Sequence, residues 1–541
     1  MKKIAFLFCV ASCLWLLSCK DFLKENPRDQ VPEEEAFSDA SSVYLNTVAT
    51  LYNYIGGYSE SQGLQGTYRG VYDLNTFTTD EAILPTRGGD WYDGGFWQGL
   101  FLHKWGTNSD AIRATWEYLY KVIVLSNKSL EVIQRMQKLH DYNYLRTYEA
   151  EVRSIRAMYY YYLVDLFGRV PLILSSSTPM KDVLQSDRKE IFDFIVSELQ
   201  LSLPLLSSER SNQLGDYYGR ITKPVAFFLL AKLALNAEVF TDNDWTDGVR
   251  PNGRNIFFSV TGRRLNAWQT VEAYCDSITS CGYELSSDYT ANFSVFNESS
   301  GENIFTIPMD KNLYTNQMQY LFRSRHYNHA KAYGLSGENG SSATIEALRT
   351  FGYDTDSVDN RFDICYYAGI MSDLDGNTIY LDNGKTLEYL PWEVKLDLSG
   401  QPSEQTAGAR MKKYEIDKTA TKDGKLMDND IVLYRYADVL LMKCEAKVRN
   451  GETGDEELNM IRSRVGMPER KATLENILAE RQLEFAWEGW RRQDLVRFGL
   501  FTRPYSDRPQ LPNEANGYTT VFPIPDKVRA MNTNLTQNPG Y

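Results

Sequence analysis

The chain has 541 residues and a mass of 62.1 kDa, with 43% hydrophobic and 24% charged residues. This composition is ordinary for a globular protein and excludes a disordered, collagen-like or multiply membrane-spanning chain. The formal net charge is −13 and the sequence has no long basic run, which excludes nucleic-acid binding as a function class. Aromatic residues reach 13%, an excess that needs an explanation.

The first residues predict an export signal. Lys2 and Lys3 precede an apolar stretch over residues 4–17, which has the length of a signal peptide and is short for a membrane span. The tetrapeptide that ends at Cys19, Leu-Leu-Ser-Cys, resembles the bacterial lipobox, whose Cys becomes a lipid-bearing N-terminus. A plain secretory signal that happens to contain cysteines is the alternative.

These motifs divide the chain. We expect a lipoprotein signal peptide over residues 1–18, a lipid-anchor linker over 19–35 and a single domain over 36–541. The cysteines after Cys19 are too few and too scattered for a disulfide framework. Cys275 and Cys281 could still form a bridge across a helix end.

Long segments with helical periodicity dominate the rest of the chain. In one of them Ser109 is placed to cap a helix, and another ends at Gly168. Paired helices of this length resemble tetratricopeptide-type repeats, in which each pair stacks on the next. The predicted helices cover residues 38–55, 109–136, 146–167, 187–204, 222–240, 265–280, 431–449 and 472–498.

A different pattern appears between about residues 282 and 430. This stretch is rich in Gly, Asn, Asp and Tyr, with short strand-like runs such as the one from Ile304 to Ile307. It predicts a large irregular insertion between two helical blocks. Long ordered loops in a compact protein usually carry function.

Metal-binding motifs are weak in this sequence. His326 and His329 are three residues apart, but no Cys or carboxylate follows at a matching spacing. Residues 373–377, Asp-Leu-Asp-Gly-Asn, resemble half of a calcium loop, although the Gly comes too early for an EF-hand and no closing Glu follows. A surface turn is the simpler interpretation, and a structural calcium is the alternative.

A charged cluster lies on the apolar stripe of the last long predicted helix. Charges on such a stripe must be paired when they are buried. The cluster is therefore either an acid/base site or, as we favour, an internal ion network. Its members are Arg481, Glu484, Glu488, Arg491 and Asp494.

The aromatic excess is more informative at residues 86–97, where Trp, Tyr and Phe occur with two Asp and an Arg in a glycine-rich loop. Sugar rings stack on aromatic faces, while carboxylates bind their hydroxyl groups. Asp90, Trp91 and Trp97 are thus candidate ligand-binding residues, unless the two Trp side chains are anchors packed beneath the loop. A second aromatic set, in the irregular insertion, contains Tyr320, Phe322, Tyr327 and Tyr333.

Several motifs in order along the chain resemble one family. They are Thr79-Asp80-Glu81 with the Gly-Asp-Trp loop after it, the blocks 151–171, 219–232, 433–446 and 481–498, and the ending 522–541. Together they are similar to the SusD/RagB nutrient-binding lipoproteins of Gram-negative bacterial outer membranes.

The resemblance implies a mainly α fold in which about four tetratricopeptide-like helix pairs support a variable, loop-rich half. It also implies a non-enzymatic, cofactor-free lid that captures oligosaccharides, or in some branches peptides, for a TonB-dependent, SusC-like barrel transporter. In the family's founding starch-binding member, an Arg that matches Arg69 helps to hold the sugar, and a Tyr falls near Tyr320. Leu84 and Thr86 stand where that member has Trp, which leaves the ligand open.

Four functions therefore compete. The first is a glycan-binding lipoprotein at the cell surface, and the second is a peptide-binding member of the same family. The third is a glycoside hydrolase whose paired carboxylates need not be close in sequence. The fourth is a scaffold whose helix pairs bind only protein.

Overall fold

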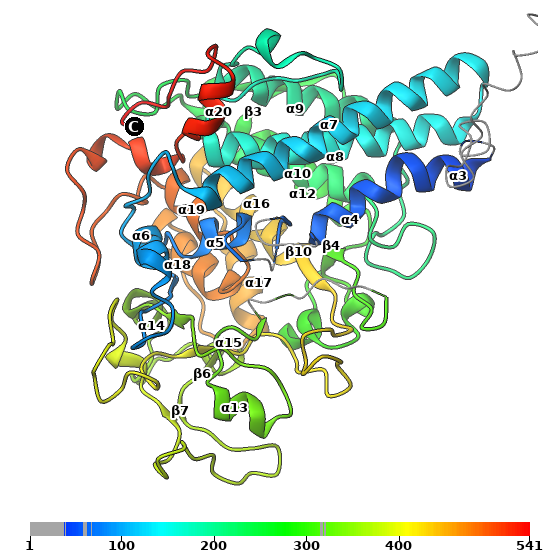
Figure 1. Cartoon of the computed structure of the whole chain (residues 1–541). Coiled ribbons are helices and arrows are strands. Elements are labelled where there is room, and N and C mark those ends of the chain that lie inside the picture. Colours follow the sequence, from blue (N-terminus) through cyan, green and yellow to red (C-terminus); the bar gives the residue numbers. More distant parts are fainter. Residues whose placement is uncertain (1–36, 38, 58–61, 66–67, 314–317, 319–320) are drawn as a thin grey trace, which may run out of the picture.

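A computed structural model describes residues 37, 39–57, 62–65, 68–313, 318 and 321–541. Helices dominate it, which confirms the mainly α prediction (Figure 1). The predicted signal peptide, Cys19 and the linker lie outside the described residues. The helices of the first block are α3 (Ala40–Tyr44), α4 (Thr50–Gly56), α5 (Val71–Thr76), α6 (Phe96–Phe101), α7 (Asp110–Leu139), α8 (Asn143–Phe167), α9 (Arg188–Ser202), α10 (Lys223–Leu235), α11 (Ala237–Phe240) and α12 (Ala267–Ser280).

The long helices α7 and α8 form a hairpin that extends from the body of the molecule (Figure 1). The side chain of Ser109 accepts the N–H of Ile112, as a capping residue should. Helix α8 ends at Gly168, whose φ of 69° favours glycine, and a Cβ there would lie 2.8 Å from the ring of Trp245. Both ends of these helices are thus specified by local sequence.

The helices stack in a layered order. Helix α8 packs between α7 and α9, while α12 packs between α10 and α16 (Tyr436–Asn450). That these stacked pairs repeat a tetratricopeptide geometry stays a prediction. The remaining helices of the C-terminal block are α17 (Asp455–Arg464), α18 (Leu474–Phe485), α19 (Arg491–Arg497) and α20 (Asp526–Met531).

The stretch between the helical blocks is loop-rich, as predicted, and lies at the end of the molecule opposite α7 to α9 (Figure 1). It contains short helices and short strands, and the strands pair in twos, including β6 with β9 and β7 with β8. The helices and strands from residue 327 onward are α13 (Tyr327–Ala332), β5 (Ser342–Ala343), α14 (Ile345–Phe351), α15 (Phe362–Cys365), β6 (Tyr366–Tyr367), β7 (Gly369–Ile370), β8 (Glu388–Tyr389) and β9 (Arg410–Met411). The other short strands are β1 (Ala82–Ile83), β2 (Phe257–Val260) and β3 (Arg263–Asn266).

Two predicted helices need correction. The helix over 431–449 begins with a strand, β10 (Ile431–Arg435), which pairs with β4 (Asn303–Ile307), the strand-like run that the sequence did predict. The helix over 472–498 is broken between α18 and α19. Its interruption includes Trp487, with a φ of 67°, and Gly489, with a φ of 76°, and a helix cannot continue through either.

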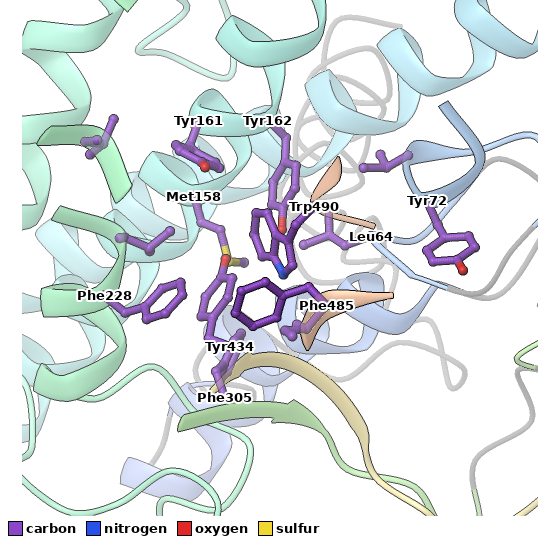
Figure 2. Packing of buried hydrophobic residues seen from close by; sticks show 14 of the residues in the cluster. Leu64, Tyr72, Met158, Tyr161, Tyr162, Phe228, Phe305, Tyr434, Phe485 and Trp490 are labelled. Atoms are coloured by element: carbon purple, nitrogen blue, oxygen red, sulfur yellow. The ribbon is translucent and has the colours of Figure 1, made fainter. Parts of the chain in front are cut away.

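The core explains much of the aromatic excess. Tyr162 of α8 points toward Tyr434 of β10 (Figure 2), while the ring of Tyr161 meets that of Phe240 edge-on with centroids 5.7 Å apart. The rings of Phe228 and Tyr434 stack with centroids 4.4 Å apart. The same buried cluster includes side chains from Val43 near the start to Leu535 near the end of the described residues. One continuous core therefore joins the N-terminal and C-terminal blocks.

The structure also decides a question about the cysteines that the sequence left open. Cys275 and Cys281 are both free thiols, so the bridge considered as an alternative is not formed. Six residues apart at the end of α12, they point to different sides of the helix. Within the ranges described above, none of the helices combines the length and the apolar composition needed to cross a bilayer.

Candidate functional site

The glycine-rich loop over residues 86–97 is a defined structure. Arg87 and Asp90 exchange two backbone hydrogen bonds of 3.0 Å, which close a tight turn. The backbone N–H of Leu398 donates to the carbonyl of Thr86 over 2.9 Å, so the loop is fixed to a second segment. Trp91 and Asp93 adopt positive φ angles of 64° and 43°. Tertiary contacts hold this backbone in place, because side-chain-bearing residues rarely adopt such angles unaided.

Arg87 anchors the loop to the segments around Ser342 and residues 404–407. Its guanidinium is buried and donates to the carbonyls of Glu404 and Ala407 and to the hydroxyl of Ser342 over 2.7–2.9 Å. Burial, with the nearby charge of Arg410, lowers the pKa of Arg87 well below its usual value. This Arg is committed to the fold and is not a ligand-binding group.

The prediction that Trp97 is a ligand-binding residue needs correction. Its side chain is only 1% exposed, and its indole N–H donates to Asp93 Oδ2 over 2.8 Å. It packs edge-on against Phe77 and Phe96. A ring enclosed in this way has no face for a sugar. Trp97 is therefore an anchor packed beneath the loop, which was the alternative interpretation.

Trp91 is intermediate between platform and anchor. The ring is half-buried, and its N–H donates to the backbone carbonyl of Glu338 over 2.9 Å. A Cβ on Gly340 would lie 2.8 Å from the indole, so this glycine permits the close packing of the ring on the chain. Only the exposed part of Trp91 remains for a ligand.

The rings that do face solvent are tyrosines. Tyr92 is 60% exposed and Tyr327, the first residue of α13, is 45% exposed. The hydroxyl of Tyr327 donates to Oδ2 of the exposed Asp90 over 2.9 Å. Partial burial and this carboxylate raise the pKa of Tyr327 to about 12. We call Tyr92, Tyr327 and Asp90 the tyrosine surface.

Neighbouring groups extend the tyrosine surface. The side-chain amide of Asn328 donates to the carbonyl of Tyr380 and to Asp382 Oδ1 over 2.9 and 3.0 Å. Tyr380 is itself exposed. The hydroxyl of Tyr68 donates to the carboxylate of Glu338. Aromatic faces and hydrogen-bond acceptors therefore alternate here, which suits a ligand with hydroxyl groups around apolar rings.

Arg69 lies on the other flank of the loop. Its guanidinium is 3.0 Å from Asp93 Oδ2 and sits over the ring of Phe96 at 5.6 Å from the centroid. It borders a groove of about 690 Å³ between the loop and the start of α7. The groove is also lined by Phe96, Lys104, Trp105, Asp110 and Arg113.

The predicted site residues are thus partly brought together. Asp93 binds both Arg69 and Trp97, and the rings of Trp91 and Trp97 are 6.0 Å apart. Tyr320 lies outside the described residues. Of the second aromatic set, Phe322 is buried and Tyr333 is half-buried. Tyr92 and Tyr327 were not among the predicted ligand-binding residues, because sequence position does not reveal which rings of an irregular segment reach solvent.

The Thr-Asp-Glu motif is structural in this chain. Asp80 is buried and accepts bidentate hydrogen bonds from Arg491 of α19 at 2.6 and 2.9 Å. It also accepts one from Arg503 over 2.9 Å. The neighbouring carboxyl group of Glu81 accepts the backbone N–H of Trp487 over 3.1 Å. The motif therefore ties the segment before the loop to the interruption between α18 and α19.

The charged cluster of the last predicted helix is an internal ion network, as favoured. Glu484 pairs with Arg361, Arg435 and Arg464, all of them buried. Burial alone would raise the pKa of Glu484, but these arginines hold it well below its usual value. Arg481 pairs with Asp494, as predicted within the cluster, and also with Asp438. These carboxylates have no access to a substrate and are not an acid/base site.

The weak metal motifs have other roles. His329 is buried and its Nδ1 lies 3.0 Å from the hydroxyl of Tyr389. Burial, with the nearby charge of Arg325, lowers the pKa of His329 to about 3. Asp373 accepts the N–H groups of Asp375 and Asn377, which makes residues 373–377 a turn. Among the described residues, no group of three or more His, Cys, Asp or Glu side chains is arranged to hold a metal ion.

Comparison with known proteins supplies the family. A model described as "SusD family" matches residues 301–541, and one described as "Starch-binding associating with outer membrane" matches residues 22–235. The chain is 24% identical to the starch-binding protein SusD of Bacteroides thetaiotaomicron, with 89% of this chain and 87% of that protein covered. It is 23% identical to the SusD-like protein P25 of Formosa agariphila, with 99% of both chains covered.

Solved structures agree on the fold. A laminarin-binding SusD-like protein superposes with a TM-score of 0.67 at 22% identity, covering 93% of this chain and 99% of that one. Surface glycan-binding protein A of Bacteroides thetaiotaomicron, in complex with laminarihexaose, gives a TM-score of 0.68 at 18% identity, covering 92% and 99%. The two family models together match residues 22–235 and 301–541, and relatives align along nearly the whole length of the chain. The chain therefore belongs to the SusD family.

Proposed function

We propose that this protein binds oligosaccharides at the tyrosine surface and the adjoining groove and delivers them to a TonB-dependent, SusC-like transporter of the outer membrane, on which it acts as a lid. The tyrosine surface carries this proposal. The exposed ring of Tyr327 holds the carboxylate of Asp90 in place, and the exposed ring of Tyr92 follows two residues after Asp90 in the same loop. Sugar stacking needs exposed faces, and its specificity needs fixed acceptors.

The relatives support the choice of a sugar. The names of two of them state starch and laminarin binding, and a third was solved with laminarihexaose. The charged group of the tyrosine surface is the carboxylate of Asp90, and the half-buried Arg69 at the edge of the groove is already paired with Asp93. Neutral hydroxyl-rich chains fit this charge balance better than anionic glycans.

Binding without catalysis is the second part of the proposal. The densest carboxylate cluster, around Glu480 and Glu484, is buried and fully paired with arginines. A glycosidase needs two carboxylates facing the same glycosidic bond, one of them able to give up a proton. The exposed acid of the tyrosine surface, Asp90, instead accepts the hydroxyl of Tyr327.

Membrane attachment is the third part. We propose that residues 1–18 are removed, that Cys19 is acylated, and that the linker over 19–35 connects the lipid to a domain over 36–541 facing the cell surface. The family description, which associates these proteins with the outer membrane, supports this location. The continuous core supports the single domain, with residues from about 282 to 430 as its loop-rich insertion.

Calorimetric titration of the purified chain lacking residues 1–19 tests the binding proposal. The panel is a set of neutral oligosaccharides, including laminarihexaose and maltoheptaose, and a mixture of peptides. We expect saturable binding of at least one glycan, with the glycan recovered unshortened by chromatography. Binding of peptides alone would favour the peptide branch of the family, and release of shorter sugars would show a hydrolase.

The transporter is tested separately by extracting the native protein from membranes in mild detergents. A lid should co-purify with a large β-barrel. Recovery as a free monomer in every mild detergent would contradict delivery while leaving glycan binding intact.

A further inference from the structure

The loop-rich half displays a second aromatic pair, formed by residues other than those of the tyrosine surface. Trp392 is 43% exposed, whereas every other Trp among the described residues is buried or half-buried. It lies in a 3₁₀ turn, Pro391–Glu393. The indole N–H has no protein partner in the part of the chain that the structure describes. An exposed indole offers an apolar face for stacking and an N–H group that can donate to a ligand.

The turn that carries Trp392 is held firmly. The backbone of Leu390 donates to the carbonyl of Thr406 over 3.0 Å and accepts the N–H of Gly408 over 2.8 Å. The N–H of Glu393 donates to the carbonyl of Leu390 over 3.1 Å and closes the turn. The ring is therefore presented by a fixed backbone, which lowers the entropy cost of binding.

Tyr353 completes the pair. Its ring centroid is 5.9 Å from that of Trp392, and the two planes meet at 46°. Tyr353 is half-buried because it stacks on Phe362, with centroids 4.6 Å apart and planes 29° from parallel. Phe362 in turn is buried in the main core. The pair is thus a rigid, angled wedge of two rings, open on the side of Trp392.

Acceptors surround the wedge. The carboxylates of Asp354, Asp363 and Glu388 lie near enough to the hydroxyl of Tyr353 to raise its pKa, after the larger effect of burial. These three side chains and that of Glu393 are exposed, and none of the four carboxylates has a hydrogen-bond or ion-pair partner among the described residues. These carboxylates can accept hydrogen bonds from the hydroxyl groups of a sugar that stacks on the wedge. The negative charge of the carboxylates repels uronate or sulfate groups.

We propose that Trp392 and Tyr353 form a second carbohydrate-binding site, which stacks a ring of a neutral glycan while the tyrosine surface holds another part of the same or a neighbouring chain. This inference rests on the proposed glycan binding and adds a second point of attachment to it. The two sites share one frame, because the segment after Trp392 is bonded to the loop of the tyrosine surface through Leu398 and Thr86. Two sites on a fixed frame favour long polysaccharides over short oligosaccharides, since the second contact is intramolecular.

Native gels that contain a polysaccharide, laminarin or soluble starch, measure retention of long chains, and calorimetry with laminarihexaose or maltoheptaose measures binding of short ones. For Trp392→Ala we expect about three- to tenfold weaker retention by the long chain that the wild type binds. Affinity for the short oligosaccharide should change by less than about twofold, because the tyrosine surface is intact. Trp392→Phe, which keeps a ring, should retain most of the binding, and the melting temperature of both variants should match the wild type.

A background that lacks the first site makes the test decisive. In the double variant Tyr92→Ala/Tyr327→Ala, we expect weak residual retention by the polysaccharide, which a further Trp392→Ala abolishes. Retention of Trp392→Ala equal to the wild type in both backgrounds would overturn the second site and leave the proposed function standing. Failure of the wild type to bind any glycan would overturn the proposed function, and the second site with it.

Discussion

The hydroxyl of Tyr327 lies 2.9 Å from Oδ2 of Asp90, although the two residues are 237 positions apart in the chain. This hydrogen bond joins the first turn of α13, in the loop-rich half, to the glycine-rich loop that precedes the long helices. The carboxylate of Asp90 and partial burial both favour the protonated form of Tyr327, whose pKa is raised to about 12, so its hydroxyl is a donor in this bond. A carboxylate and a ring are thereby held in one orientation before any ligand arrives.

Trp97 should contribute to stability and not to binding. We expect Trp97→Ala to lower the free energy of unfolding by ~3–5 kcal/mol, because it removes a buried ring and leaves a cavity. Denaturant unfolding followed by circular dichroism measures this. Tyr92→Ala is the matched control in the same loop and should leave stability within about 0.5 kcal/mol. A stable Trp97→Ala protein with lost glycan affinity would contradict the anchor role.

Arg491 and Arg503 both bind Asp80, but from different environments. Arg491 is buried, whereas the side chain of Arg503 is 42% exposed. Arg491→Met should destabilise the fold by ~3–5 kcal/mol, because it removes the bidentate partner of a buried carboxylate. Arg503→Met should cost about 1 kcal/mol or less. Equal effects of the two substitutions on urea unfolding would show that the Thr-Asp-Glu motif does not depend on the buried pair.

Glu81 should make stability depend on pH. Burial raises the pKa of Glu81 to about 8, so between the unfolded pKa of about 4.5 and this value the folded state holds a proton that the unfolded state has lost. Its contribution is complete below the unfolded pKa and is lost as the pH rises through the folded pKa. Glu81→Gln keeps an acceptor for the N–H of Trp487 but cannot titrate.

The measurement for Glu81 is the free energy of unfolding at pH 5 and at pH 8. The loss of stability between these two values should be smaller in Glu81→Gln than in the wild type. An identical loss in both proteins would assign the pH dependence to other groups.

Cys19 should determine where the protein resides. We expect Cys19→Ala to shift the protein from the outer-membrane fraction to the soluble fraction, because acyl chains supply the membrane affinity and no helix in the described ranges could replace them. Immunoblots of separated membranes measure this. Cys281→Ala, a half-buried thiol in the folded domain, is the control and should stay membrane-bound. A membrane-bound Cys19→Ala protein would refute the lipid anchor.

Local signals in the sequence account for much of the fold. Ser109 and Gly168 mark helix ends through capping and backbone conformation, and these are properties of a few adjacent residues. The strand over residues 431–435 was missed because its apolar pattern runs directly into that of α16. Only its pairing with β4, more than a hundred residues earlier, decides between strand and helix.

The site was less predictable for the same reason. The resemblance and the loop composition led to Arg69 and to the glycine-rich loop, which the structure brings together through Asp93. The composition could not show that Trp97 is enclosed by Phe77 and Phe96, or that Tyr327 reaches across to Asp90. Exposure of a ring in an irregular segment depends on long-range packing, and a single sequence does not display it.

The central claim is that the tyrosine surface binds a glycan, and the titration of Tyr92→Ala/Tyr327→Ala with an oligosaccharide that the wild type binds tests it most directly. Both rings are exposed, so the variant should melt at the wild-type temperature. Loss of two stacking faces should weaken the affinity by about tenfold or more. Unchanged affinity in a folded double variant would contradict the account and place the oligosaccharide elsewhere on the protein.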